Sequence, residues 1–379
     1  MRIPRGPSDL TSTWLTLALR RSGILRSDAV ANLTSVAEVG EDRGFTGRVF
    51  RLTLDEPISL EDGATARTLI AKLPLAARAG QSAGVAATWP PTPTSEGHLA
   101  RSAREIHFYL DLAPVSGVAV PHCLFAAMVA ADERMVLLLE DLSADRFGDV
   151  LTGCSRGDAA LGLASIARLH GTWWQRPLPM PWLAGWTDDH DDAQVRLERN
   201  IARLPDHVVA TFPDDIGELL RRLAGGAYRS VLTTLGEVPR TLIHGDLHLD
   251  NIAFRDDAPE TLPIITDWQT VGVGPAVVDL AAFLTGALGA THRRDQETTL
   301  LTAWHEALLA TGVSDYSRDR LERDYGLALI RQLAGIFGWL ANTDLSSLAG
   351  RERDVTLAAI GDGRLIAALR DHDPLALLV

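Results

Sequence analysis

Lysine and cysteine are the two residues that this 379-residue chain almost lacks. Its two cysteines, Cys123 and Cys154, are too few for a disulfide framework or for a four-thiolate zinc site. No stretch approaches the ~18 apolar residues that cross a bilayer, and the N-terminus lacks the apolar core and cleavage site of a signal peptide. We therefore expect a cytoplasmic protein that makes no membrane contact.

Positive charge is also in short supply, because 36 basic residues stand against 49 acidic ones and the net charge is −13. A protein that binds a polyanion normally carries an excess of basic residues, so nucleic acid is not expected as a partner. The sequence gives no sign of an obligate protein partner either. Hydrophobic residues make up 46% of the chain, which is ample for a buried core and excludes disorder.

The single lysine is Lys72, whereas the other 35 basic residues are arginine. The composition thus uses arginine wherever a generic positive charge is enough. Lysine carries a compact ammonium, whereas the planar guanidinium of arginine fits different partners. The lone lysine indicates a position where a point-like cation is needed, unless it is a chance survival.

The first part of the chain is expected to be rich in β-structure. An amphipathic helix at 8–22, capped by Ser8 or Asp9, opens it, and a second helix follows at 100–112. Apolar runs predict five strands, and Lys72 falls at the end of the third. These strands lie at 36–39, 49–54, 68–73, 123–129 and 135–139.

The rest of the chain shows the apolar periodicity of helices. The expected helices lie at 158–174, 213–235, 318–341 and 354–369. We therefore expect an α+β protein of two lobes. Residues 1–142 form a small sheet-rich lobe, and residues 143–379 form a large, mainly helical lobe.

A polar turn at 256–259 between two short apolar runs predicts a β-hairpin. Asn251 lies just before the first strand of this hairpin, and Asp267 lies just after the second. The open ends of an antiparallel pair are neighbours, so these two side chains are expected to come together. Asp246 lies on the loop that leads into the hairpin.

Two oxygen ligands, one amide and one carboxylate, beside a second carboxylate suit Mg²⁺, which prefers oxygen and takes few protein ligands when phosphate is present. Phosphoryl transfer requires such a set of groups. Ligands hold the metal, another carboxylate accepts the proton of the attacking hydroxyl, and a cation neutralises the phosphates. Asp246, Asn251 and Asp267, together with the lone lysine, therefore favour phosphoryl transfer.

The chain resembles the kinase-like phosphotransferases, which include aminoglycoside phosphotransferases, choline kinases and ecdysteroid-kinase-like proteins. The similarity spans about residues 36–285 and rests on His-Gly-Asp-x-His-x-x-Asn at 244–251, Asp-Trp-Gln at 267–269, Glu-x-x-Phe-Tyr at 105–109 and Leu-Glu-Asp-Leu at 139–142. It implies a two-lobe protein-kinase-like fold. It also implies transfer of the γ-phosphoryl group of ATP, or of GTP, to a hydroxyl of a small molecule such as an antibiotic, a sugar or choline.

The resemblance implies roles for individual residues. Asp246 is expected to be the catalytic base, and Asn251 and Asp267 are expected to be the Mg²⁺ ligands. Lys72 is expected to contact the nucleotide phosphates, and Glu105 from the helix at 100–112 is expected to hold it.

Further positions follow from the same resemblance. Glu140 and Leu142 fall in the hinge between the lobes, whose backbone is expected to bind adenine. Gly44 is expected to approach the phosphates, although the glycines at 40–47 depart from the Gly-x-Gly-x-x-Gly spacing of protein kinases. Asp279 is expected to cap a helix and to brace the catalytic loop through backbone N–H groups.

Two alternative functions are open at this point. His244, Asp246 and His248 have a strand-like spacing that also suits a metal-dependent hydrolase. That alternative needs a further His or Cys ligand and leaves Lys72 and Asp267 without a role. A degenerate nucleotide-binding protein is the other alternative, and the intact catalytic positions argue against it.

The acceptor site has one weak sequence signal. Four tryptophans lie close to four aspartates, at 173, 174, 182 and 186 and at 188, 189, 191 and 192. This cluster is either an aromatic, acidic pocket for a cationic or sugar-like substrate, or core tryptophans beside a solvated acidic loop. The second interpretation is favoured.

Overall fold

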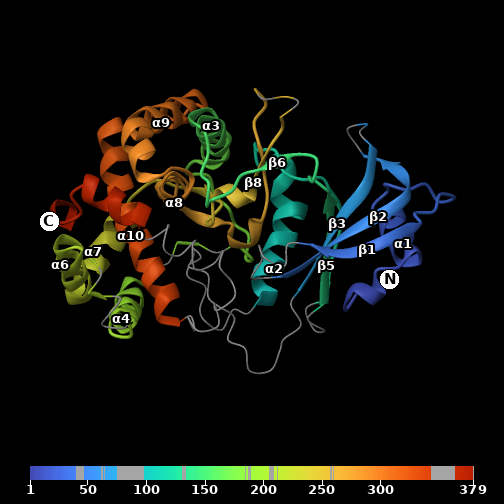
Figure 1. Ribbon diagram of the computed structural model, residues 1–379, viewed down its shortest axis with the longest axis horizontal. Helices are drawn as coiled ribbons and strands as arrows, with labels where there is room; N and C mark the ends of the chain where they lie inside the picture. The colour runs from blue at the N-terminus through green and yellow to red at the C-terminus, as the bar shows by residue number, and fades with distance from the viewer. Residues whose placement is uncertain are drawn as a thin grey trace.

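The computed structural model has a five-stranded antiparallel sheet at one end and a large group of helices at the other (Figure 1). Helix α2 (His98–His107) lies between the two parts. This arrangement is the expected α+β, two-lobe architecture. The structure describes residues 1–39, 47–60, 63, 65–74, 98–129, 134–183, 185–186, 189–204, 209–210, 212–256, 258, 260–342 and 363–378.

The sheet has the strand order β1-β2-β3-β5-β4, and each neighbouring pair is antiparallel. Its strands are β1 (Leu33–Val39), β2 (Gly47–Ser59), β3 (Thr65–Pro74), β4 (Cys123–Val129) and β5 (Arg134–Glu140). All five expected strands are therefore present. Side chains alternate across the sheet, so Leu69, Ala71 and Leu73 of β3 are buried in one core while Lys72 faces the opposite side.

Helix α1 (Ser12–Arg21) packs its apolar side chains into that core, on the side of the sheet away from the helices. Its N-cap is Thr11, whose hydroxyl accepts a hydrogen bond from the backbone amide of Trp14. The expectation of a cap at Ser8 or Asp9 is wrong, because Pro7–Asp9 forms a separate 3-10 turn before the helix begins. The helix therefore begins about one turn later than expected.

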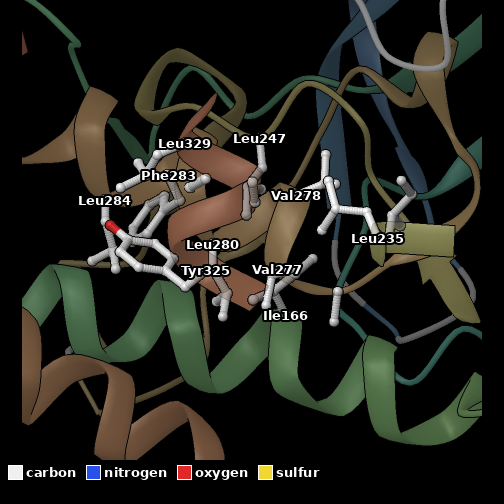
Figure 2. Close-up of a cluster of buried hydrophobic side chains, with 14 of the residues drawn as sticks. Ile166, Leu235, Leu247, Val277, Val278, Leu280, Phe283, Leu284, Tyr325 and Leu329 are labelled. Atoms are coloured by element: carbon white, nitrogen blue, oxygen red, sulfur yellow. The ribbon is translucent and has the colours of Figure 1, made fainter. Parts of the chain in front are cut away.

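The helices form the second part of the molecule. They are α3 (Arg156–Trp173), α4 (His190–Ile201), α6 (Asp214–Arg222), α7 (Tyr228–Gly236), α8 (Val277–Ala287), α9 (Ala290–Ala310) and α10 (Arg318–Asn342). A cluster of buried side chains from α3, α7, α8 and α10 fills the space between them, among them Ile166, Leu235, Leu280 and Tyr325 (Figure 2).

Two expected helices, those at 158–174 and 318–341, match α3 and α10 closely. The single helix expected at 213–235 is instead divided into α6 and α7, because Gly226 has a φ of 111° and breaks the helical path. The expected helix at 354–369 begins outside the described residues, and 363–371 is helical. None of the described helices combines the length and apolar character needed to cross a membrane.

Short strands connect the sheet to the helices. β8 (Ile252–Phe254) and β9 (Ile264–Ile265) pair antiparallel, with Ile252 opposite Ile265, which confirms the expected hairpin. β6 (Arg146–Phe147) joins this hairpin, and β7 (Arg240–Ile243) pairs with β10 (Gly272–Pro275). The loops at the ends of these strands carry the candidate site.

The close approach of α3 and α9 generates a stability prediction. A Cβ atom added at Gly171 of α3 would lie 2.6 Å from the Cβ of Thr311, whose hydroxyl is held by the carbonyl of Leu308. We expect Gly171→Ala to lower the free energy of unfolding by about 1–3 kcal/mol through overpacking. Gly217→Ala in α6 is the matched control, because nothing lies within 4 Å of its added Cβ.

The control is expected to raise the free energy of unfolding by about 0.5–1 kcal/mol, as alanine does in an open helical position. Urea denaturation of both variants checks this pair. Equal stability of the two variants would contradict the tight packing of α3 on α9.

Candidate active site

Lys72 and Glu105 form a partly buried ion pair between β3 and α2. The distance from Lys72 Nζ to Glu105 Oε1 is 2.6 Å, and Glu105 is 2% exposed. Burial works to lower the pKa of Lys72, but the charges of Glu105 and Asp267 outweigh it and raise this pKa above its ordinary value. The lone lysine of the chain is therefore a fixed cation.

The hairpin places Asp267 beside this cation. Asp267 follows β9, and its Oδ1 atom lies 3.7 Å from Lys72 Nζ. The next residue back, Thr266, donates from its backbone amide to the carbonyl of Asn251 at 2.9 Å. The open end of the hairpin thus holds Asn251 close to the segment that carries Asp267, as the sequence predicts.

The loop between β7 and β8 is held by its own polar groups. His244 Nδ1 accepts from the backbone amide of Asp246 at 3.3 Å, and its Nε2 donates to the carbonyl of Thr266 at 2.9 Å. The side-chain amide of Asn251 donates to the carbonyl of Asp246 at 3.0 Å and to His248 Nε2 at 3.2 Å. These bonds fix Asp246, His248 and Asn251 in one loop, called the catalytic loop below (residues 244–251).

Asp279 supports the backbone of the catalytic loop. Its two carboxylate oxygens accept from the backbone amides of His244 at 2.8 Å and Gly245 at 2.9 Å, and His170 Nε2 lies 3.2 Å from Oδ2. Burial opposes ionisation, but the hydrogen bond and charge of His170 and the loop amides outweigh it and lower the pKa of Asp279. The expected brace is present.

The expectation that Asp279 also caps a helix is wrong. Asp279 lies inside the first turn of α8, and the residue in the N-cap position is Ala276. Its carboxylate is therefore turned to the backbone of the catalytic loop rather than to the amides of its own helix.

Asp267 has an unusual backbone conformation for a residue with a side chain. Its φ of 62° and ψ of 65° lie in the left-handed region, where glycine is preferred. The next residue, Trp268, is fully buried, and its ring stacks on Phe108 of the π-helical turn after α2 at 3.9 Å and 8°. This packing stabilises the strained conformation that aims Asp267 at the site.

The residues at the hairpin end fit a hard cation such as Mg²⁺. Asp267 Oδ1 is buried and lies 3.7 Å from Lys72 Nζ, beyond hydrogen-bond distance, which leaves this oxygen available to a ligand. The amide nitrogen of Asn251 is used in the catalytic loop, which leaves its amide oxygen as the atom for a metal. Carboxylate and amide oxygens are the ligands that Mg²⁺ prefers.

Asp246 lies among several charged groups that act on its pKa. Burial raises its pKa above the ordinary value, and the charge of Asp267 adds to this effect, while His248, His244 and Arg101 oppose it. His248 Nε2 lies 3.9 Å from Asp246 Oδ2. A raised pKa brings the carboxylate closer to the range in which it accepts a proton effectively.

The hinge residues lie where the sheet meets the hairpin. The backbone amide of Glu140 donates to the carbonyl of His122 at 2.9 Å, and its side chain accepts from the amide of His122. Leu142 is buried against Ala253 and Ile264. Gly44, the remaining expected nucleotide contact, lies outside the described residues.

Two contacts near the site are absent from the sequence-based expectations. Gln269 donates to Glu105, and Arg104 donates to the carbonyl of Gln269. The sequence signal for Gln269 is its place in the Asp-Trp-Gln motif, which gave it no contact with Glu105. Arg101, one helical turn before Glu105, is the other missed residue, because its charge acts on Asp246 from α2.

Five described members of the tryptophan and aspartate cluster have structural contacts of their own. Trp174 and Trp186 are buried in the core of the helical part. Asp189 caps α4, and Asp191 and Asp192 pair with arginines, so these acidic groups serve local structure. The favoured interpretation, core tryptophans beside an acidic surface segment, agrees with these positions.

Solved structures share this fold. Wild-type aminoglycoside 2'-phosphotransferase-IIIa in its GDP complex is 14% identical, covers 93% of this chain and 98% of its own, and has a TM-score of 0.53. Macrolide 2'-phosphotransferase MphH from Brachybacterium faecium is 17% identical, with coverages of 93% and 98% and a TM-score of 0.50. A choline/ethanolamine kinase family protein from Mesorhizobium loti is 16% identical, with coverages of 96% and 98% and a TM-score of 0.51.

At these identities the similarity establishes the fold and not the substrate. The chain therefore has the two-lobe fold of kinase-like phosphotransferases, as its motifs predict.

Residues 218–341 match a protein-family profile described as uncharacterized oxidoreductase dhs-27. This segment is less than half of the chain and contains the catalytic loop and Asp267. It has no Gly-x-Gly-x-x-Gly fingerprint of the kind that binds a nicotinamide dinucleotide. Comparison with curated proteins gives no significant match.

The brace by Asp279 predicts a pH-dependent stability. A lowered folded-state pKa means that Asp279 stabilises the fold fully above the ordinary aspartate pKa and loses this contribution as the pH falls through the lowered value. We expect Asp279→Asn to lower the free energy of unfolding by about 3 kcal/mol at pH 7, because one buried partner is removed. The difference from wild type is expected to shrink from about pH 5 towards pH 2.

Urea denaturation across this pH range measures the difference. Asp256→Asn, an exposed change in the hairpin turn, is the control and is expected to have little effect. A difference between wild type and Asp279→Asn that stays constant down to pH 2 would contradict the lowered pKa.

Proposed function

We propose that this protein is a small-molecule kinase that transfers the γ-phosphoryl group of ATP to a hydroxyl of its acceptor. The observation that carries the proposal is the joining of Lys72, Glu105 and Asp267 through contacts of 2.6 and 3.7 Å. These residues come from β3, α2 and the end of the hairpin, which lie far apart in the sequence. A structural ion pair alone gives no reason to aim a second, strained carboxylate at the same ammonium.

Each residue has one task in this proposal. Lys72 neutralises the nucleotide phosphates, and Glu105 keeps its ammonium in place. Asn251 and Asp267 would hold Mg²⁺, which, when bound, shields the negative charge of the phosphates during transfer. Asp246 accepts the proton of the attacking hydroxyl, a task that its raised pKa supports. GTP is the alternative donor, since solved neighbours include GDP complexes.

The acceptor is proposed to be a small molecule with a hydroxyl group. The neighbours with the same fold are named for aminoglycosides, macrolides and choline or ethanolamine. Each of these is a small molecule that carries a hydroxyl group. The net charge of −13 supports neither nucleic acid nor an anionic membrane surface as a partner. The proposal needs no protein partner, and cytoplasmic location remains the expectation from the sequence.

The metal-dependent hydrolase alternative is disfavoured by the contacts of His244. Both of its ring nitrogens are engaged in hydrogen bonds within the site, which leaves neither free for a metal. Among the described residues, no group of three or more His, Cys, Asp or Glu side chains is arranged to hold a metal ion. The degenerate alternative is left to experiment.

The role of Asp246 predicts loss of transfer without loss of nucleotide binding. We expect Asp246→Asn to reduce phosphoryl transfer about 10²–10⁴-fold, because the amide does not accept the hydroxyl proton. ADP release, measured with a panel of aminoglycosides, macrolides, choline and sugars, checks the rate. Asp256→Asn in the hairpin turn makes the same chemical change away from the site and is expected to keep wild-type activity. Equal activity of Asp246→Asn and wild type would refute the assigned role.

The role of Asp267 predicts a different defect. Asp267→Ala is expected to weaken metal-dependent binding of a non-hydrolysable ATP analogue about tenfold or more, since an oxygen ligand is lost. Asp246→Asn serves as the comparison and is expected to bind the analogue nearly as wild type does. The reverse pattern, with binding lost in Asp246→Asn and kept in Asp267→Ala, would contradict the two assignments.

A further inference from the structure

Glu105 has one partner on each of its carboxylate oxygens. Oε1 accepts from Lys72 Nζ at 2.6 Å, and Oε2 accepts from the side-chain amide of Gln269 at 3.5 Å. Glu105 and Gln269 are both buried, so the contact between them is shielded from water. A buried carboxylate oxygen that loses its donor is costly. The amide of Gln269 therefore helps to determine the position of the Glu105 carboxylate.

The turn that carries Gln269 is docked on α2 by two more contacts. The carbonyl of Gln269 accepts from Arg104 Nη1 at 3.2 Å, and the ring of Trp268 stacks on Phe108. Arg104, Glu105 and Phe108 lie on neighbouring turns of one helical segment. Two consecutive residues after Asp267 thus contact three positions on and just after α2.

We propose that Gln269 is a positioning residue that holds Glu105, and through it Lys72, in register with Asp267. Because Gln269 lies two residues after Asp267, one short turn fixes both the lysine partner and the proposed metal ligand. The site is then assembled before any nucleotide arrives. This inference rests on the proposed function only in the tasks given to Lys72 and Asp267, and the geometry of Glu105 is tested without nucleotide.

The composition supplies a direct reporter for this geometry. Lys72 is the only lysine, so an amine-acylating reagent has one side-chain target in the whole chain. An ammonium held by Glu105 reacts slowly, and one whose partner has moved reacts faster. Acetylation of the Lys72 peptide, followed by mass spectrometry with the N-terminal amine as internal reference, measures how firmly Glu105 holds Lys72.

Gln269→Leu removes the amide and is expected to raise the acetylation rate of Lys72 about threefold or more in the absence of nucleotide, as for coupled residues in contact. Gln332→Leu is the matched control. Its amide also makes a partly buried contact, with Thr285 in α8, and it does not touch Glu105. The control is expected to leave the rate unchanged. Gln269→Met, which keeps the side-chain length, replaces the leucine variant if that variant does not fold.

A double-mutant cycle separates positioning from general loosening. In the Glu105→Gln background, where the carboxylate is already lost, Gln269→Leu is expected to add no further increase in rate. An unchanged rate in Gln269→Leu, the same increase in Gln332→Leu, or a full further increase in the Glu105→Gln background would each overturn the proposal.

Activity is measured in parallel and reports on the proposed function separately. Gln269→Leu is expected to lower kcat about tenfold, because the reaction is sensitive to small displacements of charged groups. If wild type proves inactive with every donor and acceptor, the proposed function fails, while the acetylation rates still decide the role of Gln269.

Discussion

The ion pair between Lys72 and Glu105 is the contact on which the arrangement of the site depends. It joins the sheet to α2, and α2 is joined in turn to the end of the hairpin through Gln269 and the stack of Phe108 on Trp268. Two buried charges are costly to desolvate, so such a pair is poor evidence for stability alone. Its value lies in fixing one ammonium at a defined place between the two parts of the molecule.

The acidic half of the site depends on a second buried group, Asp279. Its carboxylate accepts from two successive amides of the catalytic loop, and Asp279 itself is fully buried in the first turn of α8. The loop that carries Asp246 is therefore supported by a helix as well as by its own hydrogen bonds. Lys72 and Asp246 are thus anchored in different parts of the fold, and Asp267 lies beside the lysine.

Much of this arrangement is readable from the sequence. The period-2 alternation of β3 places Lys72 opposite the core face, and the spacing of Asn251 and Asp267 around a hairpin turn brings both to one end. Gln269 is not readable in this way, because its bond to Glu105 spans 164 residues and depends on the tertiary docking of α2. The break at Gly226 escapes prediction for a related reason: apolar periodicity continues across it, and only the φ of 111° divides the helix. The acceptor stays unidentified, because side chains that recognise a substrate follow no periodic pattern.

The most direct test of the central claim is a calorimetric titration of a non-hydrolysable ATP analogue into wild type and Lys72→Ala, each with Mg²⁺ present and removed. The account predicts that wild type binds the analogue more tightly with Mg²⁺ and that Lys72→Ala weakens this binding. Failure of wild type to bind under either condition, or equal binding by the two proteins, would contradict a nucleotide site built around Lys72.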